Sequence, residues 1–202
     1  MQPSPLIVAA AIFALAAPQL ATAPASATPP PPPRTGTNCD ARVYVIDDLV
    51  CGSPALLALD QQVAEAFAAT PDANHPEHPR LVDAQSDWYW RSRQCFKAPD
   101  QPACLTAAYT ERLAVLAVLR APPAAGAGED GHCKGAPWGE KAVKLNRTGD
   151  GPLVVSDLDG TVIAVAATPN RAGWTAYMTL TNRAAPWKLE HYQGLVMACR
   201  TG

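Results

Sequence analysis

Six cysteines limit what this chain can fold into more than any other feature of it. They are Cys39, Cys51, Cys95, Cys104, Cys133 and Cys199. An even number of cysteines in an exported chain is typical of a disulfide framework. Sequence alone fixes no pairing, but four cysteines precede residues 122–131 and two follow them. If that stretch is a linker, Cys133 pairs with Cys199, and a bridge between Cys95 and Cys104 would join two helices.

The N-terminus has the features of an export signal. Residues 6–17 are uncharged and apolar, and at 12 residues they are shorter than the ~20 needed to span a bilayer as a helix. Ala25-Ser26-Ala27 is typical of a cleavage site. We therefore expect a signal peptide over residues 1–27, a periplasmic or secreted protein, and no stable membrane span after cleavage. No basic residue precedes the apolar run, so retention as an anchor is the alternative.

A proline-rich segment follows the cleavage site. Residues 29–33 are consecutive prolines, which hold a chain extended and prevent helix or ladder formation. We expect a stiff tether over residues 28–38. No cysteine stands directly after the apolar run, so lipid attachment at a signal-peptide cysteine is not expected.

Residues 39–120 have helical periodicity. Ser53 followed by Pro54 is an N-cap with proline at the first helical position, and a third helix is expected to begin after Asp100. A short helix is expected between Cys39 and Cys51. The positions at helical spacing are Leu56, Leu59, Val63 and Phe67, then Leu81, Ala84, Trp88, Arg91 and Cys95 on a second helix, then Leu105, Tyr109, Leu113 and Leu116 on the third.

Beyond Gly131 the periodicity changes to that of short strands. Gly, Asn, Asp and Pro separate the β-prone runs. These runs are residues 142–145, 153–156, 162–166, 174–180, 188–191 and 195–199. We predict an α+β protein with a small disulfide-bonded helical domain over 39–120, a linker over 121–131 and a small antiparallel β-sheet or barrel domain over 132–202.

Four blocks of residues in the helical half carry a family resemblance. In chain order they are Cys39 and Cys51-x-x-Pro54-x-Leu56-x-x-Leu59-Asp60, then Gln85-x-x-Trp88, then Arg91-x-x-x-Cys95, then Cys104-Leu105-x-x-x-Tyr109-x-x-Arg112-Leu113. This series resembles the N-terminal domain of the LprI-type lysozyme-inhibitor family over residues 39–120. Asp60, Arg91 and Arg112 interrupt apolar helical faces, and we interpret them as paired structural charges. Direct contact with a partner is the alternative.

The second half resembles more loosely the membrane-bound inhibitor of C-type lysozyme, MliC. Such domains carry a Ser-Gly-Ala-Arg-Tyr-like loop, whose place is taken here by residues 171–177, with Trp187-Lys188 downstream. The serine is absent and the Gly–Tyr spacing is longer. The resemblance implies that Thr175, Tyr177 and Lys188 contact the target, because a lysozyme cleft presents two carboxylates. The alternative is that Tyr177 is a sheet residue and Lys188 a solvated strand end.

A phosphatase-like string lies between two of the expected strands. Residues 153–161 are similar to the nucleophile motif of haloacid-dehalogenase-type phosphatases, which uses two aspartates and Mg²⁺. Only Glu190 supplies a carboxylate after Thr161, so the Mg²⁺ shell lacks further ligands. Asp159-Gly160 is instead a hairpin-turn signal. Metal sites are not expected elsewhere, since there is no C-x-x-C and His75 and His78 have no third ligand nearby.

The charge balance and the lack of catalytic motifs limit the classes of function that we expect for this chain. The chain has 16 Lys and Arg against 18 Asp and Glu, so the basic excess that nucleic acid requires is absent. No nucleophile motif is found, and we expect no enzyme activity and no cofactor. Residues 39–120 carry 7 basic and 11 acidic side chains, which favours encounter with a cationic protein. The expected function is occlusion of a lysozyme-like glycosidase; the alternatives are binding of cell-wall glycan or another envelope protein, or a structural adaptor.

Overall fold

The computed structural model describes residues 35–70, 82–135, 139–147, 149–170, 172–182 and 184–202. All of them belong to one compact unit, residues 33–202. The expected signal peptide, most of the tether, and His75 and His78 lie outside the described residues.

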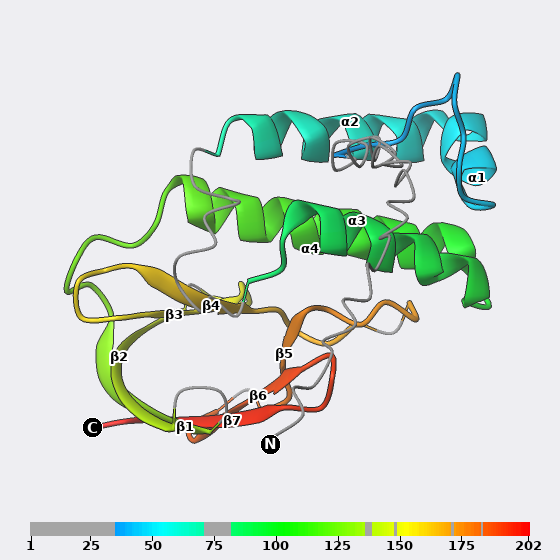
Figure 1. The fold of residues 1–202 in the computed structure, drawn as a ribbon. Helices are drawn as coiled ribbons and strands as arrows, with labels where there is room; N and C mark the ends of the chain where they lie inside the picture. The colour runs from blue at the N-terminus through cyan, green and yellow to red at the C-terminus, as the bar shows by residue number, and fades with distance from the viewer. Residues whose placement is uncertain (1–34, 71–81, 136–138, 148, 171, 183) are drawn as a thin grey trace, which may run out of the picture. The chain divides into compact units, whose positions relative to one another are not determined.

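In the helical half, the described residues form four α-helices, labelled in Figure 1, and one 3₁₀ turn. Their bounds are α1 Asp47–Gly52, α2 Pro54–Ala68, α3 Gln85–Arg93, η1 Gln94–Lys97 and α4 Gln101–Arg120. The Ser53 hydroxyl accepts a hydrogen bond from the Leu56 N–H at 3.4 Å, and the Asp100 carboxylate accepts one from the Ala103 N–H at 3.0 Å. Both predicted helix starts are therefore confirmed, each with a proline in the first turn.

Seven antiparallel strands form one sheet, in the order β4-β3-β2-β1-β7-β6-β5. They are β1 Glu129–Gly135, β2 Gly139–Arg147, β3 Leu153–Ser156, β4 Val162–Ala166, β5 Met178–Leu180, β6 Trp187–His191 and β7 Val196–Thr201. A single parallel bridge between Ala167 and Thr179 brings the two edge strands together. The sheet is thus nearly closed, and the α+β prediction is confirmed.

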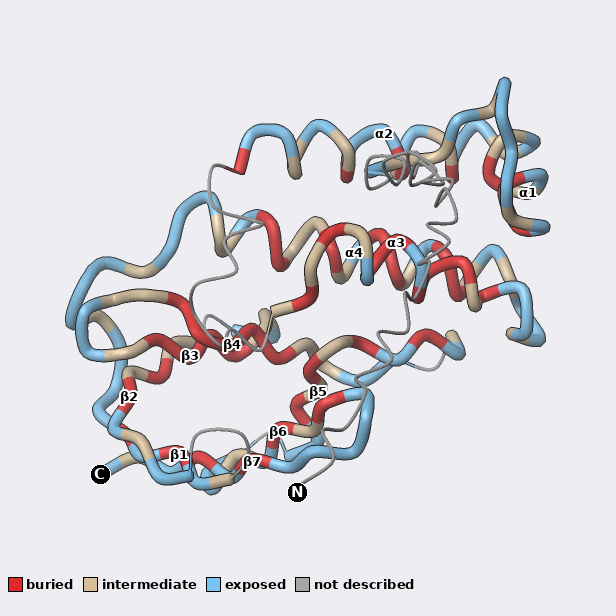
Figure 2. The backbone as a smooth tube through the Cα atoms, in the orientation of Figure 1, coloured by how far each residue is buried: buried red, intermediate tan, exposed pale blue. Residues whose placement is uncertain are grey.

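Strands β3 and β4 are buried along their whole length (Figure 2). One face of this hairpin, with Val155 and Ala164, belongs to the interior of the sheet. The other face, with Val154 and Val165, packs against Val115 of α4. An antiparallel hairpin that is apolar on both faces needs a cover on each, and α4 supplies the second one.

The prediction of two separate domains is not confirmed. Residues 33–202 form one compact unit, and two of its apolar clusters contain residues from both halves. One is the cluster around Val115 described above. The other joins Trp174, from the β half, to Trp88 and Leu105 of the helices. The uninterrupted apolar runs at residues 153–155 and 162–166 are the sequence signal for such two-sided burial.

Two predicted boundaries in the β half differ from the structure. The expected linker ends too late, because β1 begins at Glu129 and pairs with β2 on one side and β7 on the other. Charged residues and glycines give β1 little intrinsic strand preference, so its pairing alone defines it. The expected strand over 174–180 is also too long: only Met178–Leu180 is strand, and Trp174 packs into the helical core.

Three disulfides join the six cysteines in sequential pairs. Cys39 pairs with Cys51, Cys95 with Cys104 and Cys133 with Cys199. The second bridge links η1 to α4, and the third links neighbouring positions of β1 and β7. The expected bridges Cys95–Cys104 and Cys133–Cys199 are both confirmed.

Helix α4 is long and apolar enough to cross a membrane by length and composition, the one such helix among the described residues. Its buried face carries Leu105, Ala108 and Tyr109, which belong to the helical core. Core helices of this kind pass the same test.

Candidate functional site

An arginine missing from the predicted set lies at the centre of the helical half. Arg93 is 1% exposed and pairs with two carboxylates, Asp47 at 3.1 Å and Asp60 at 3.4 Å. Its guanidinium also donates to the Tyr109 hydroxyl at 3.1 Å and to the Thr37 hydroxyl at 3.0 Å. The pKa of Tyr109 is raised, chiefly by burial, so this phenol stays neutral.

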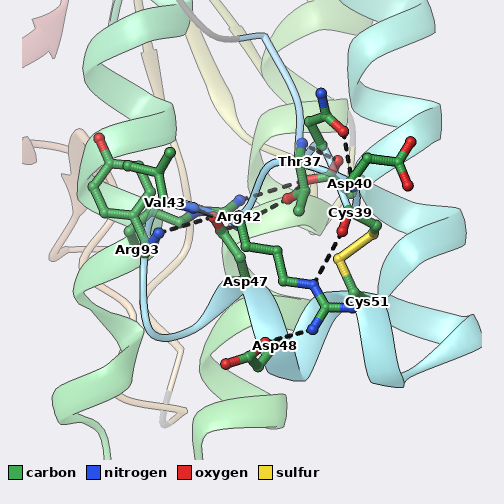
Figure 3. Close-up of a disulfide and its surroundings, with 12 residues drawn as sticks. Thr37, Cys39, Asp40, Arg42, Val43, Asp47, Asp48, Cys51 and Arg93 are labelled. Carbon is green, nitrogen blue, oxygen red and sulfur yellow. Dashed lines mark hydrogen bonds and ion pairs between the residues drawn. A yellow bond between two sulfur atoms is a disulfide. The ribbon is translucent and has the colours of Figure 1, made fainter.

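The same two carboxylates hold the N-terminal segment in place. Asp60 accepts from the backbone N–H of Thr37 at 2.7 Å, and Asp47 accepts from the N–H groups of Val43 and Tyr44, each at 2.9 Å. Figure 3 shows Asp47 reaching Val43 and Arg93 beside the Cys39–Cys51 disulfide. Asp60 thus serves here as a buried, paired charge.

Arg91 connects the helices to the β half. It is buried on α3 and forms an ion pair with Asp83, in which Nε donates to Oδ2 at 2.9 Å. Its Nη1 donates to the backbone carbonyl of Thr175, 84 positions further along the chain, at 2.9 Å. This side chain therefore fixes the segment that was expected to form a contact loop.

Three aromatic rings of the β half surround the Arg91 guanidinium. The distances from Cζ to the ring centroids are 4.8 Å for Trp174, 5.5 Å for Tyr177 and 4.7 Å for Tyr192. A guanidinium at such distances is attracted to the face of each ring. Arg91 therefore positions Trp174, Tyr177 and Tyr192 relative to α3.

Arg112 is the third buried arginine. Its Nε donates to the Gln85 amide oxygen at 2.8 Å and its Nη1 to the Asp83 carbonyl at 2.9 Å. Its guanidinium also lies 5.8 Å from the Trp88 ring. Burial lowers the pKa of Arg112 to about 10. The residues of the Gln-x-x-Trp motif and Arg112 thus meet in one internal cluster.

The three predicted target-binding residues do not form one projecting loop. Trp174 is 7% exposed, and Thr175 is tied to Arg91 through its carbonyl, so the segment packs against α3. Tyr177 pairs with the end of β6, where its carbonyl accepts from the N–H of Tyr192. Lys188, on β6, precedes Tyr192 by four residues, which places it about 13 Å away at ~3.3 Å per residue. Lys188 therefore lies apart from Thr175 and Tyr177.

A surface pocket of about 480 Å³ lies where the helices meet the segment around Trp174. We call it the aromatic pocket. Its wall comes from α3, η1, the start of α4, the Gly173–Thr175 region and the end of β6. The residues that line it are Trp90, Arg91, Gln94, Cys95, Lys97, Ala98, Pro99, Cys104, Gly173, Trp174, Thr175 and Tyr192.

Large exposed rings surround the aromatic pocket. Trp90 is 55% exposed, Tyr192 is 40% exposed, and Phe96, next to the lining residue Cys95, is 43% exposed. The ammonium of Lys97 lies 5.2 Å from the Phe96 ring. Exposed aromatic residues beside a hollow mark interaction surfaces, because such apolar area is costly to leave in water. No local sequence pattern predicts this surface, since its residues come from four separate segments.

Glu111 on α4 is a further ionisable group that sequence reasoning missed. Its Oε2 is shielded from solvent and has no hydrogen-bond partner among the described residues. The pKa of Glu111 is raised to about 7. Burial is the largest cause and Asp83 adds to it, while Arg112 and Arg91 act in the opposite direction. Near neutral pH this carboxyl is therefore close to half ionised.

Stability should fall with rising pH because of Glu111. Between about pH 4.5 and pH 7 the folded protein keeps a proton that the unfolded chain has released, so each step upward favours unfolding. Glu111→Gln removes this titration and should be more stable than the wild type by about 2–3 kcal/mol at pH 8, with little difference at pH 4.5. The measurement is urea unfolding of both proteins from pH 4.5 to pH 8.

The difference between the two proteins is the quantity to compare. His191, whose pKa burial lowers, stabilises the fold as pH rises and acts equally in both. Glu65→Gln, on the exposed face of α2, is the control and should show no pH-dependent difference from the wild type. A constant offset between wild type and Glu111→Gln would contradict the assignment.

The phosphatase-like string forms a hairpin turn, as predicted. The Asp157 carboxylate accepts from the N–H groups of Asp159 at 3.1 Å and Thr161 at 2.8 Å, and β3 and β4 run antiparallel on either side. Gly160 has φ +87°, a conformation that glycine adopts without strain. The described residues contain no group of three His, Cys, Asp or Glu side chains that could hold a metal.

Comparison of the chain with protein-family models, with curated proteins and with solved structures finds no match. The geometry of the aromatic pocket and the resemblances of the sequence are therefore the basis for a functional proposal.

Proposed function

We propose that this chain is an exported protein of the bacterial cell envelope that binds a lysozyme-like glycosidase and blocks its cleft without chemistry of its own. The observation that carries the proposal is that exposed Trp90 and Tyr192 line the aromatic pocket, with exposed Phe96 between the lining residues Cys95 and Lys97 in the chain. Tryptophan and tyrosine dominate the binding energy of protein interfaces, and charged pairs at their edges speed encounter. The LprI-like series of residues 39–120 supports the choice of partner.

In this proposal Lys97, and not Lys188, is the cation that pairs with a carboxylate of the lysozyme cleft. A lysozyme cleft presents two carboxylates, and a cation next to a hydroxyl complements them. Lys97 and Thr175 line the same pocket, and both are exposed. Lys188 lies about 13 Å along β6 from this region and faces Glu190 at 4.0 Å.

Binding of a cell-wall glycan is the second candidate, and the hollow itself favours it. A cavity of about 480 Å³ is large enough for a sugar ring. Trp90 and Tyr192 supply aromatic faces for the C–H groups of the ring, while the Gln94 amide and the Thr175 hydroxyl can pair with its hydroxyls.

One titration tests the first proposal. Turnover of a labelled cell-wall substrate by a C-type lysozyme is measured with increasing amounts of the purified, oxidised protein. We expect inhibition that saturates near one-to-one and weakens with salt. Trp90→Ala should raise the inhibition constant about tenfold or more, whereas Lys188→Ala should leave it within about twofold.

The outcomes separate the two candidates. No inhibition by folded protein at about 50 μM, a concentration that would saturate a micromolar complex, would reject the inhibitor. Binding of soluble peptidoglycan fragments by the same preparation, lost in Trp90→Ala, would then support the glycan site. Absence of both effects would reject both functions for this pocket.

A further inference from the structure

A second pocket of about 520 Å³ lies along α4 and shares no lining residue with the aromatic pocket. We call it the α4 pocket. Small residues form much of its wall, among them Ala114 of α4, Pro152 before β3 and Ala167 after β4. Small side chains at these positions leave space that longer ones would fill. The volume falls in the range of roughly 300–1,000 Å³ typical of small-molecule sites.

Two polar atoms on this wall have no hydrogen-bond partner among the described residues. Oε2 of Glu111 and Oγ1 of Thr168 are both shielded from solvent, and neither has a hydrogen-bond partner among the described residues. Leaving such atoms unpaired costs about 1–3 kcal/mol each. The terminal torsion of a glutamate is broad, so a small rotation can turn the Glu111 carboxylate toward the pocket.

The charged side chains on the pocket wall determine whether a bound molecule is a cation or an anion. Glu111 and Asp150 are its two ionisable side chains, and no Lys, Arg or His is among the lining residues that the structure describes. Arg91 donates to Asp83 and Thr175, and Arg112 donates through Nε and Nη1 to Gln85 and the Asp83 carbonyl, while its buried Nη2 has no partner among the described residues. Neither arginine lines the pocket, and the two ionisable groups that do are acidic, which favours a cation over an anion as the occupant.

We propose that the α4 pocket binds a small organic ammonium ion with a short apolar body. The ammonium would donate to Glu111, and the Thr168 hydroxyl is available as a second acceptor. The alkyl part would lie against the alanine and proline wall, where its transfer from water is favourable. This proposal does not depend on the function of the aromatic pocket.

The test compares two probes of nearly equal shape, n-pentylammonium and 1-pentanol, titrated separately into the ¹⁵N-labelled full chain and followed by NMR. We expect pentylammonium to shift backbone amides of residues 103–114 and 167–176, with an affinity about tenfold higher than that of pentanol. Its affinity should rise by up to about tenfold from pH 6 to pH 8, as Glu111 loses its proton.

Two variants separate the charge from the cavity. Glu111→Gln should remove the preference for pentylammonium over pentanol, whereas Glu65→Gln, on the exposed face of α2, should retain it. Ala114→Leu should weaken both probes together, because it fills the pocket. Equal affinity of the two probes for the wild type, a preference that persists in Glu111→Gln, or shifts that cluster outside these segments would each overturn the proposal.

Discussion

Replacement of Arg93 by alanine is expected to leave the protein without a cooperatively folded helical half. The change removes the one guanidinium that pairs with both Asp47 and Asp60, and both carboxylates are buried. Breaking a buried ion pair from one side costs about 3–5 kcal/mol, since the remaining charge is left uncompensated. Two carboxylates lose their partner here. Total stabilities are about 5–15 kcal/mol, so the loss approaches the whole.

Urea unfolding followed by circular dichroism measures this effect. Arg42→Ala is the matched control, because Arg42 also pairs with an aspartate, Asp48 at 2.7 Å, but on the surface. Exposed pairs contribute about 0–1 kcal/mol, so the control should unfold close to the wild-type midpoint. A loss of less than about 1 kcal/mol in Arg93→Ala would show that the buried network is not essential.

Removal of the Cys133–Cys199 disulfide is expected to have the second-largest effect. The bridge closes a loop over a sequence separation of 66, the longest of the three. In the chain-entropy model such a loop contributes about 4 kcal/mol by restricting the unfolded chain. The double variant Cys133→Ala/Cys199→Ala should lose about this amount, although β1 and β7 keep their ladder.

The Cys95–Cys104 bridge provides the comparison. Its sequence separation is 9, for which the same model gives about 3 kcal/mol. All four of these cysteines are buried, so both double variants also lose packing of the sulfur atoms. Guanidinium unfolding of the two double variants should therefore place Cys133→Ala/Cys199→Ala at the lower stability. The reverse order would mean that local packing, and not loop length, decides the contribution of each bridge.

The helical half shows how far local patterns reach. Ser53 was identifiable as an N-cap, and the helix start after Asp100 was predictable, because capping chemistry with a proline in the first turn is a local arrangement, complete within a few residues. The Asp159-Gly160 turn was predictable for the same reason. The role of Arg93 was not predictable, because its position on α3 shows no periodic signal and its partners Asp47 and Asp60 lie 46 and 33 residues away.

The β half shows where such patterns fail. Strand β1 has little strand preference of its own and is defined by its neighbours β2 and β7. Trp174 is in a β-prone run, yet Arg91 and the helical core draw it out of the sheet. In both places tertiary contacts override the local preference.

By itself, the sequence determined the α+β class, the helix starts and the hairpin turn, and it suggested two of the three disulfides without fixing them. These depend on short-range periodicity, on capping chemistry and on the position of each cysteine along the chain. Only the tertiary structure decided that the two halves share cores, that Trp174 and Thr175 pack against α3, and that Trp90, Lys97, Thr175 and Tyr192 line one pocket. The reason is physical: these contacts join residues tens of positions apart, so no local pattern specifies them, and the cover that the outer face of β3 and β4 needs comes from α4, a distant segment of the chain.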